Sequence, residues 1–475
     1  MATGAPPRAL SERVIGLVRD CKARILEASI EEIATSGLSP IGFFRTLSER
    51  VLEDDLGMFE SFMRLDDEIV ARMSEGFALR IAGIVSETEA ALEALGDATV
   101  QPMPKLTELL ARVDYPIMAE FFCRWNGLPS PGQNEGDFSG LFCPKPFEYA
   151  EVSTAGRTFL CCPLQVPTVI GDATEGTFAE VWNSEKAQAV RRSILDGTFS
   201  HCIEKTCGPL QSRTLPRRED IVDPFLRDII DNNRTNIDRG PTTMFMNYDR
   251  SCNLACPTCR THLILLRGRE EKASAANIQA WATADLEDAR YLHITGSGDA
   301  FGSQLFHRFL QTFDPEARPN LRLSIGTNGL LLNEKTWEKI CNRAIDVVVV
   351  SVDAATPETY AVNRGGDFRQ LVENLRFVGR LRAEGRLKVF GINFVVQQNN
   401  FREMPAFADL GASVHADGVC FQQITNWGTF TLSEFARRAV HRPEHPDHAE
   451  FLEILRHPSL ARPMVDLSNL HSLRT

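Results

Sequence analysis

Six short apolar runs in the region 243–425 constrain the fold more than any other feature of the sequence. They are rich in β-branched and aromatic residues and lie at 244–248, 291–294, 321–325, 347–350, 389–396 and 419–421. Helical patterns, such as those at 301–313 and 368–383, separate them. Six strands over about 180 residues give a repeat of about 30 residues, the size of a strand–helix–strand unit. This spacing predicts an α/β fold with a parallel sheet, whose active site gathers at the carboxyl ends of the strands.

Shifts in composition along the chain predict five parts. The 475 residues are enough for about three domains. Residues 1–135 carry apolar positions at helical spacing, which predicts a helical N-terminal domain. The parts that follow are a small cysteine-rich and turn-rich domain at 138–210, a charged connector at 211–242, the α/β region at 243–425 and a C-terminal extension at 426–475.

The charge of the chain bears on its partners. Lys and Arg number 51 and Asp and Glu number 63, so the formal net charge is −12. An acidic chain of this size favours neither nucleic acid nor an anionic membrane as a partner. The N-terminus lacks the apolar segment of a signal peptide, and the run 347–350 is too short to span a bilayer. We therefore expect a cytoplasmic protein with no nucleic-acid or membrane partner.

Eight of the twelve cysteines fall into two groups. The first comprises Cys143, Cys161, Cys162, Cys202 and Cys207, and the second comprises Cys252, Cys256 and Cys259. In a reducing compartment, grouped cysteines are more often ligands of a metal or cluster than disulfide partners. The sequence therefore predicts two metal or cluster sites.

The second group follows the first apolar run directly, as Cys252-x3-Cys256-x2-Cys259. Three thiolates from one loop suit a four-iron, four-sulfur ([4Fe–4S]) cluster that leaves one iron open. An amine and a carboxylate of a substrate can chelate that iron. A zinc ion would need a fourth ligand, for which His262 is available.

This motif at the end of a first strand resembles that of the radical S-adenosylmethionine (radical SAM) superfamily, and the resemblance covers about 243–425. It implies a partial (β/α)6 radical SAM barrel. It also implies that Cys252, Cys256 and Cys259 hold a catalytic primary [4Fe–4S] cluster. The implied cofactor is S-adenosylmethionine, which the reduced cluster cleaves to methionine and a 5′-deoxyadenosyl radical.

The turn after the second strand is similar to the glycine-rich turn that contacts the methionine amine in this family. It departs from the usual Gly-Gly-Glu but keeps an acidic end. Glycines let backbone carbonyls approach a ligand closely. The resemblance implies cofactor contacts from Thr295, Gly296, Ser297, Gly298 and Asp299.

Three later strand ends also resemble cofactor-binding segments of the family. Asn328 lies in a Thr-Asn-Gly turn after the third strand. Ser351 and Asp353 follow the fourth strand, where relatives contact the ribose. Arg364 lies where relatives place a cation for the methionine carboxylate, and Ile392 lies on the fifth strand, against which the adenine stacks.

The first cysteine group resembles the SPASM or twitch auxiliary-cluster domain, including its Gly-x4-Cys signature. The resemblance implies one auxiliary [4Fe–4S] cluster held by Cys143, Cys161, Cys202 and Cys207. A structural zinc ion on the same four residues is the alternative. Cys162 points the opposite way from Cys161 if the chain is extended there, so its role as a ligand is open. In relatives this domain usually follows the barrel, whereas here it precedes it.

The family mechanism implies a radical SAM enzyme that abstracts a hydrogen atom from an unactivated C–H bond of a peptide or small molecule. We expect a net oxidation or other C–H modification assisted by the auxiliary cluster, with a flavodoxin-type or ferredoxin-type reductant. One alternative is a dehydrogenase or epimerase of sugars or small metabolites from the same superfamily. Another is a non-catalytic iron–sulfur electron carrier or scaffold, which would need none of the expected cofactor contacts.

Overall fold

The computed structural model describes residues 7–47, 62–63, 65, 67–95 and 122–474. They belong to two compact units. The helical unit comprises Met1–Leu128 and Asn426–Phe435, and the sheet unit comprises Pro129–Thr425 and Ala436–Thr475. No helix among the described residues is long and apolar enough to cross a membrane.

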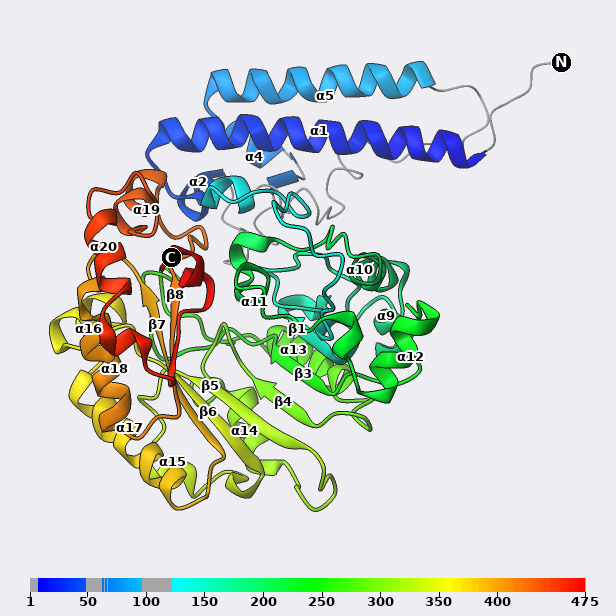
Figure 1. Cartoon of the computed structure of the whole chain (residues 1–475). Helices are drawn as coiled ribbons and strands as arrows, with labels where there is room; N and C mark the ends of the chain where they lie inside the picture. Colours follow the sequence, from blue (N-terminus) through cyan, green and yellow to red (C-terminus); the bar gives the residue numbers. More distant parts are fainter. Residues whose placement is uncertain (1–6, 48–61, 64, 66, 96–121, 475) are drawn as a thin grey trace. The chain divides into compact units, whose positions relative to one another are not determined.

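The helical unit contains α1 (Pro7–Ser36), α2 (Pro40–Leu47), α4 (Asp67–Ala71) and α5 (Glu75–Leu95). The long helices α1 and α5 lie side by side (Figure 1). Their buried faces pack with aromatic rings of α2, and the rings of Phe43 and Phe77 lie 5.8 Å apart. This apolar core confirms the predicted helical N-terminal region.

The sheet unit is built on one nine-stranded sheet with the strand order β2-β1-β3-β4-β5-β6-β7-β8-β9. Its strands are β1 (Tyr149–Ser153), β2 (Thr158–Phe159), β3 (Thr243–Asn247), β4 (Tyr291–Ile294), β5 (Arg322–Thr327), β6 (Ile345–Ser351), β7 (Val389–Val396), β8 (Gly418–Gln423) and β9 (Val465–Asp466). Every neighbouring pair is parallel except β1 and β2. Strands β3 to β8 confirm the six predicted runs.

Helices connect these strands and cover one side of the sheet. They are α13 (Arg269–Ala282), α14 (Gln304–Thr312), α15 (Glu334–Trp337), α16 (Pro357–Asn363), α17 (Phe368–Ala383) and α18 (Met404–Ser413), and α19 (Leu432–Arg438) and α20 (His448–Leu455) follow β8. Figure 1 shows the strands in an open arc with α15 to α18 along its outer side. Several begin with a side-chain cap, as where Ser303 accepts a hydrogen bond from the Phe306 N–H in α14.

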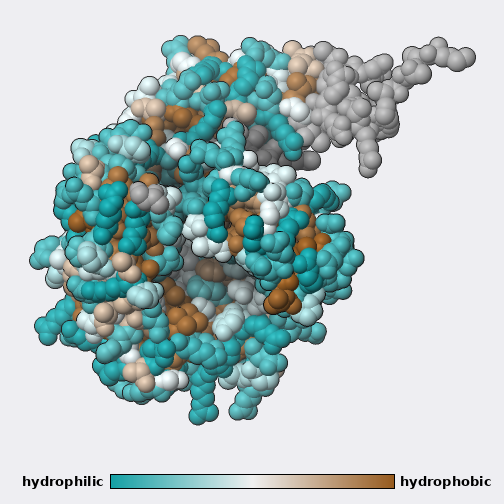
Figure 2. Space-filling view, in the orientation of Figure 1, coloured by the Kyte–Doolittle hydropathy of each residue, from teal (hydrophilic) through white to brown (hydrophobic). Residues whose placement is uncertain are grey.

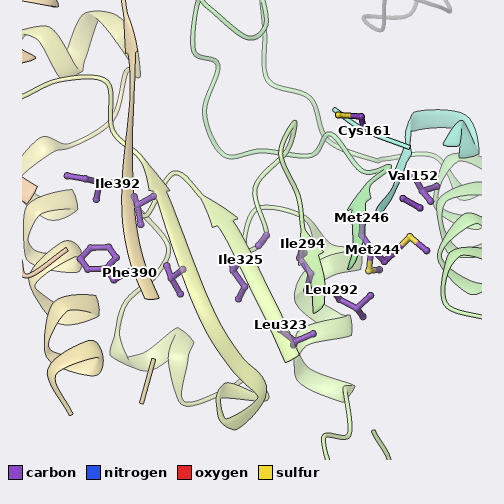
Figure 3. Close-up of a cluster of buried hydrophobic side chains, with 14 of the residues drawn as sticks. Val152, Cys161, Met244, Met246, Leu292, Ile294, Leu323, Ile325, Phe390 and Ile392 are labelled. Carbon is purple, nitrogen blue, oxygen red and sulfur yellow. The ribbon is translucent and has the colours of Figure 1, made fainter. Parts of the chain in front are cut away.

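The alternation of side chains gives the sheet two different faces. On β3, Met244 and Met246 are fully buried with Leu292 and Ile294 of β4 in the apolar core (Figure 3). Phe245 lies between the two methionines, so its side chain points to the opposite face of the sheet. The helices cover the first face, and the second face forms the inside of the arc, where polar strand residues can meet a ligand.

The cysteine-rich region is joined to the same sheet. Besides β1 and β2 it contains α8 (Lys145–Glu148), α9 (Phe178–Trp182), α10 (Glu185–Leu195) and α11 (Gly208–Gln211), followed by α12 (Pro224–Asn232) in the connector. The buried Arg191 donates to the carbonyls of Pro146 and Thr235 and stacks on Trp182 at 4.3 Å. Strand β1 pairs in parallel with β3, placing Glu151 beside Phe245. Strands β1 and β2 form a hairpin, and the sequence did not predict that this hairpin extends the barrel sheet.

The face of the protein shown in Figure 2 is mostly hydrophilic, as expected for a chain in which 24% of the residues are charged. Its apolar side chains lie in separate small patches. Large apolar residues that are exposed singly are common on proteins.

Candidate active site

The three-cysteine loop leaves the carboxyl end of β3. Cys252 and Cys256 are buried and Cys259 is half-buried. The Cys252 N–H donates to the Ile264 carbonyl at 3.0 Å and the Cys259 N–H to the Cys256 carbonyl at 2.9 Å, so the loop is held by its own backbone. Burial raises the pKa of the Cys252 thiol to about 11, and the nearby Asp299 adds to the shift. A metal cluster binding here would therefore displace thiol protons.

Each of the three sulfurs has an N–H donor. The Cys252 sulfur accepts from the Leu254 N–H at 3.4 Å and from Asn328 Nδ2 at 3.6 Å. The Cys259 sulfur accepts from Arg260 Nη2 at 3.3 Å, and the Cys256 sulfur accepts from Arg364 Nη1 at 3.7 Å. Such donors stabilise thiolate over thiol.

Two further buried polar atoms near this loop lack partners among the described residues. They are Nε of Arg364 and the hydroxyl of Tyr360. Cys256 is among the charges that act on both residues. An anionic iron–sulfur cluster with a chelating ligand would supply acceptors for such donors. The residues present therefore fit the implied cluster.

The turn after β4 begins with strained backbone. Thr295 is fully buried and has a φ of 60°. This value lies in the left-handed region, which residues other than glycine rarely adopt. A Cβ atom at Gly298 would lie 2.4 Å from the Asp249 carbonyl oxygen, so only glycine fits there. Oδ1 of Asn247 accepts from the N–H groups of Gly296 and Ser297 at 3.1 and 2.8 Å.

The carboxylate of Asp299 is fully buried and already has four protein donors. Oδ1 accepts from the N–H groups of Phe301 and Gly302, at 3.0 and 2.9 Å. Oδ2 accepts from Thr327 Oγ1 at 2.7 Å and from the Asn328 N–H at 2.8 Å. Asp299 thus joins the turns after β4 and β5. Its contact with the methionine ammonium stays a prediction.

Arg364 and Asp353 form a buried ion pair at the ends of β6 and β7. Nη2 of Arg364 lies 2.7 Å from Oδ2 of Asp353, whose Oδ1 accepts from the Val395 N–H at 2.7 Å. Burial opposes the charge on Arg364, but Asp353 and Cys256 outweigh it and raise its pKa. Asp353 also has a left-handed φ of 62°. Half-buried Ser351 ends β6 beside Asn393 of β7.

Ile392 lies on the helix-covered face of the sheet. Its side chain is fully buried in the apolar core (Figure 3), and its Cδ1 lies 3.3 Å from where a Cβ would stand at Gly411 of α18. The neighbouring residues, Gly391 and Asn393, face the inner side of the sheet. A contact between Ile392 and adenine would therefore come from its backbone.

Three cysteines of the first group lie close enough to Cys202 to affect the pKa of its thiol. Burial raises the pKa of the Cys202 thiol well above its usual value, and charges on Cys143, Cys161 and Cys207 add to the shift. Burial also raises the pKa of Cys162 to about 12, but the next causes there are Glu151 and Cys161. Cys143, Cys161 and Cys207 therefore lie near Cys202, and Cys162 lies near Glu151 and Cys161. Among the described residues, no three Cys, His, Asp or Glu side chains stand close enough to share a single metal ion.

Sequence reasoning did not single out Arg260, Asn247 or Glu151. Arg260 directly follows Cys259, so adjacency to a ligand could have identified it. Asn247 ends the first barrel strand, where polar residues commonly face a site. No sequence signal connects Glu151 with either, because their contact depends on the pairing of β1 with β3.

Family models match both cysteine regions. The model of the radical SAM superfamily matches residues 246–410, and that of an iron–sulfur cluster-binding domain, SPASM, matches residues 143–208. The chain carries a radical SAM domain and a SPASM domain. These domains imply a [4Fe–4S] cluster with S-adenosylmethionine and an auxiliary iron–sulfur cluster, as expected. No curated protein matches the chain.

Solved structures of radical SAM proteins are similar to parts of the chain. SuiB of Streptococcus suis is 14% identical, with 62% of this chain and 63% of SuiB covered and a TM-score of 0.35. SuiB bound to its precursor peptide SuiA is 13% identical over 44% of this chain and 45% of that chain, with a TM-score of 0.30. The protein anSMEcpe with bound AdoMet and a Kp18Cys peptide is 19% identical over 38% and 51%, with a TM-score of 0.29. The matches span less than two thirds of each of these proteins.

Proposed function

We propose that this radical SAM superfamily enzyme reductively cleaves S-adenosylmethionine and uses the resulting radical to abstract hydrogen from an unactivated C–H bond. The observation that carries the proposal is the arrangement at the end of β3, where three cysteines of one loop each accept a hydrogen bond. When bound, the primary cluster would supply the electron that cleaves the sulfonium to methionine and a 5′-deoxyadenosyl radical. The protein's own task is to hold and orient the cofactor.

The residues around the loop divide this task. Cys252, Cys256 and Cys259 would hold the cluster, with Arg260 donating to a sulfur. The turn 295–299, fixed by its strained start and by close-packed Gly298, would meet the methionine amine. Buried Arg364, with an unused Nε, would meet the carboxylate, while Ser351 and Asp353 would lie near the ribose. Asn328 would contribute through the cysteine loop, because its Nδ2 reaches Cys252.

The SPASM domain supports a net oxidation as the outcome. Cys143, Cys161, Cys202 and Cys207 would hold one auxiliary cluster, which could accept an electron from the substrate radical or ligate the substrate. The substrate would be a peptide or a small molecule. A dehydrogenase or epimerase of sugars or small metabolites fits the same site. The electron for the primary cluster would come from a flavodoxin-type or ferredoxin-type protein in the cytoplasm.

The test is 5′-deoxyadenosine formation by anaerobically reconstituted, reduced protein, measured by mass spectrometry with S-adenosylmethionine as the only added substrate. We expect 5′-deoxyadenosine and methionine in equal amounts. A protein that holds reducible iron–sulfur clusters but forms no 5′-deoxyadenosine would instead be an electron carrier or scaffold. Metal analysis of the same sample distinguishes an auxiliary iron–sulfur cluster from zinc, since two four-iron clusters give about eight irons per chain.

A further inference from the structure

Asn247 connects two parts of the sheet unit through both ends of its side-chain amide. Its Oδ1 accepts from the N–H groups of Gly296 and Ser297, at 3.1 and 2.8 Å, and from Ser297 Oγ at 2.8 Å. Its Nδ2 donates to Glu151 Oε1 at 3.1 Å. One residue at the end of β3 thereby holds the turn after β4 and contacts β1 of the SPASM domain.

Glu151 and the turn after β4 together determine which way this amide faces. Glu151 is only 5% exposed, and its Oε2 accepts from the Tyr149 hydroxyl at 2.8 Å. Burial raises the pKa of the Glu151 carboxyl, and the hydrogen bonds from Tyr149 and Asn247 oppose that rise. In its ionised form the carboxylate only accepts hydrogen bonds, so the amide turns its NH2 group toward Glu151. A flipped amide would set its NH2 group against the two N–H donors of the turn and its oxygen against the carboxylate. The acceptor that Asn247 offers to the turn therefore depends in part on a residue outside the radical SAM domain.

The hydrogen bonds continue from this turn to the cysteine loop. The Ser297 carbonyl accepts from Arg260 Nη2, which also donates to the Cys259 sulfur at 3.3 Å. A connected series thus runs from the SPASM hairpin to a ligand of the primary cluster, and its members are Tyr149, Glu151, Asn247, Ser297, Arg260 and Cys259.

We propose that Asn247 is a positioning residue for S-adenosylmethionine, and that Glu151 of the SPASM hairpin fixes it in the orientation that binds the cofactor. This inference rests on the proposed function, in which the turn 295–299 meets the methionine amine. Asn247 acts through Gly296 and Ser297 rather than by touching the cofactor. The SPASM domain then contributes to cofactor binding as well as holding an auxiliary cluster.

Reversing the direction of one hydrogen bond tests the proposal. Asn247→Asp keeps an acceptor for the turn but sets a second carboxylate oxygen against Glu151. We expect its dissociation constant for S-adenosylmethionine, measured by equilibrium dialysis on cluster-loaded protein, to rise at least about tenfold. Adding Glu151→Gln supplies an NH2 group that can donate to the new carboxylate. We expect this double variant to return to within about threefold of wild type, as a coupling energy between contacting residues requires.

A second ligand separates positioning from general damage. 5′-Methylthioadenosine lacks the amine and carboxylate of the methionine part, so its affinity should be the same in all variants. If Asn247→Asp fails to fold, Glu151→Ala carries the test, because it removes the acceptor for Nδ2 without adding a charge. It should weaken S-adenosylmethionine binding about threefold or more while leaving 5′-methylthioadenosine binding unchanged.

Three outcomes would overturn the inference: unchanged S-adenosylmethionine affinity in the single variant, no recovery in the double variant, or an equal loss for both ligands. The wild-type protein separates this failure from that of the proposed function. Wild-type protein that neither binds nor cleaves S-adenosylmethionine refutes the proposed function. Wild-type protein that does both, with variants that bind as it does, refutes only the role of Asn247 and Glu151.

Discussion

The two cysteine sites of the sheet unit are built in opposite ways. Cys252, Cys256 and Cys259 fall within eight consecutive positions of one loop, whereas the four predicted auxiliary ligands are spread from Cys143 to Cys207. The primary loop is held by its own backbone bonds at the end of a buried strand. The auxiliary group requires a hairpin, α10 and the loop before α11 to pack together. The first site therefore depends on local structure and the second on the fold of a domain.

The charged side chains around the cysteine sulfurs also differ between the two sites. Arginine side chains, Arg260 and Arg364, donate to sulfurs of the primary loop. In the auxiliary group, burial raises the pKa of Cys143 to about 12, with the charge of Cys161 adding to the shift. Nearby Lys145 lowers the pKa of Cys161, although burial outweighs it. Cluster binding therefore has to displace thiol protons at the auxiliary site as well.

The largest expected effect is on the primary loop. Cys256→Ala removes one of only three ligands, so we expect 5′-deoxyadenosine formation to fall to the level of cluster-free protein. Iron content should fall from about eight to about four per chain, because the auxiliary site is separate. Mass spectrometry and iron analysis measure the two results. Loss of all iron would show that the two sites are not independent.

The matching change at the auxiliary site should have a more selective effect. Cys207→Ala should also lower iron to about four per chain, yet leave 5′-deoxyadenosine formation within about tenfold of wild type. Formation of an oxidised product should stop, because the substrate radical has lost its electron acceptor. The domain is small and its ligands are dispersed, so folding must be checked by S-adenosylmethionine binding. A folded variant that still forms product at the wild-type rate would make the auxiliary site structural.

The same contrast explains what the sequence predicted. The spacing of apolar runs predicts strands β3 to β8, because strand and helix periodicities are local properties. The cysteine loop is recognisable from short spacings for the same reason. The pairing of β1 with β3 was not predicted, because it joins residues about 95 positions apart, such as Glu151 and Phe245.

Individual side chains of the site were harder to predict than its backbone. The glycines of the turn 295–299 located it in the sequence. They did not predict the four hydrogen bonds that other residues donate to the Asp299 carboxylate. Ile392 was expected to contact adenine, although strand alternation turns its side chain toward α18. Partners of this kind come from elements distant in the sequence, and only the folded sheet brings them together.

A smaller effect is expected from Arg364, which contacts the primary loop without being a ligand. Arg364→Ala should weaken S-adenosylmethionine binding by about 1.5–3 kcal/mol, or about 10-fold to 150-fold in the dissociation constant. The variant also leaves the buried carboxylate of Asp353 without its cation. Arg364→Lys keeps the charge but not the planar pair of donors. Its affinity for S-adenosylmethionine should lie between those of the wild type and Arg364→Ala. Equal affinity in folded Arg364→Ala would remove this residue from the cofactor site.

The smallest effect is expected at Cys162. Its substitution tests whether this residue is a ligand of the auxiliary cluster. Cys162 directly follows Cys161, but Glu151 is the charge that acts on it most, whereas Cys143, Cys161 and Cys207 all act on Cys202. Cys162→Ala should therefore retain about eight irons per chain and both 5′-deoxyadenosine and product formation. Cys161→Ala is the matched control, differing by one position and expected to lose about four irons. If Cys162→Ala loses iron and Cys161→Ala does not, the two neighbours have exchanged roles, and Cys162 rather than Cys161 completes the auxiliary set.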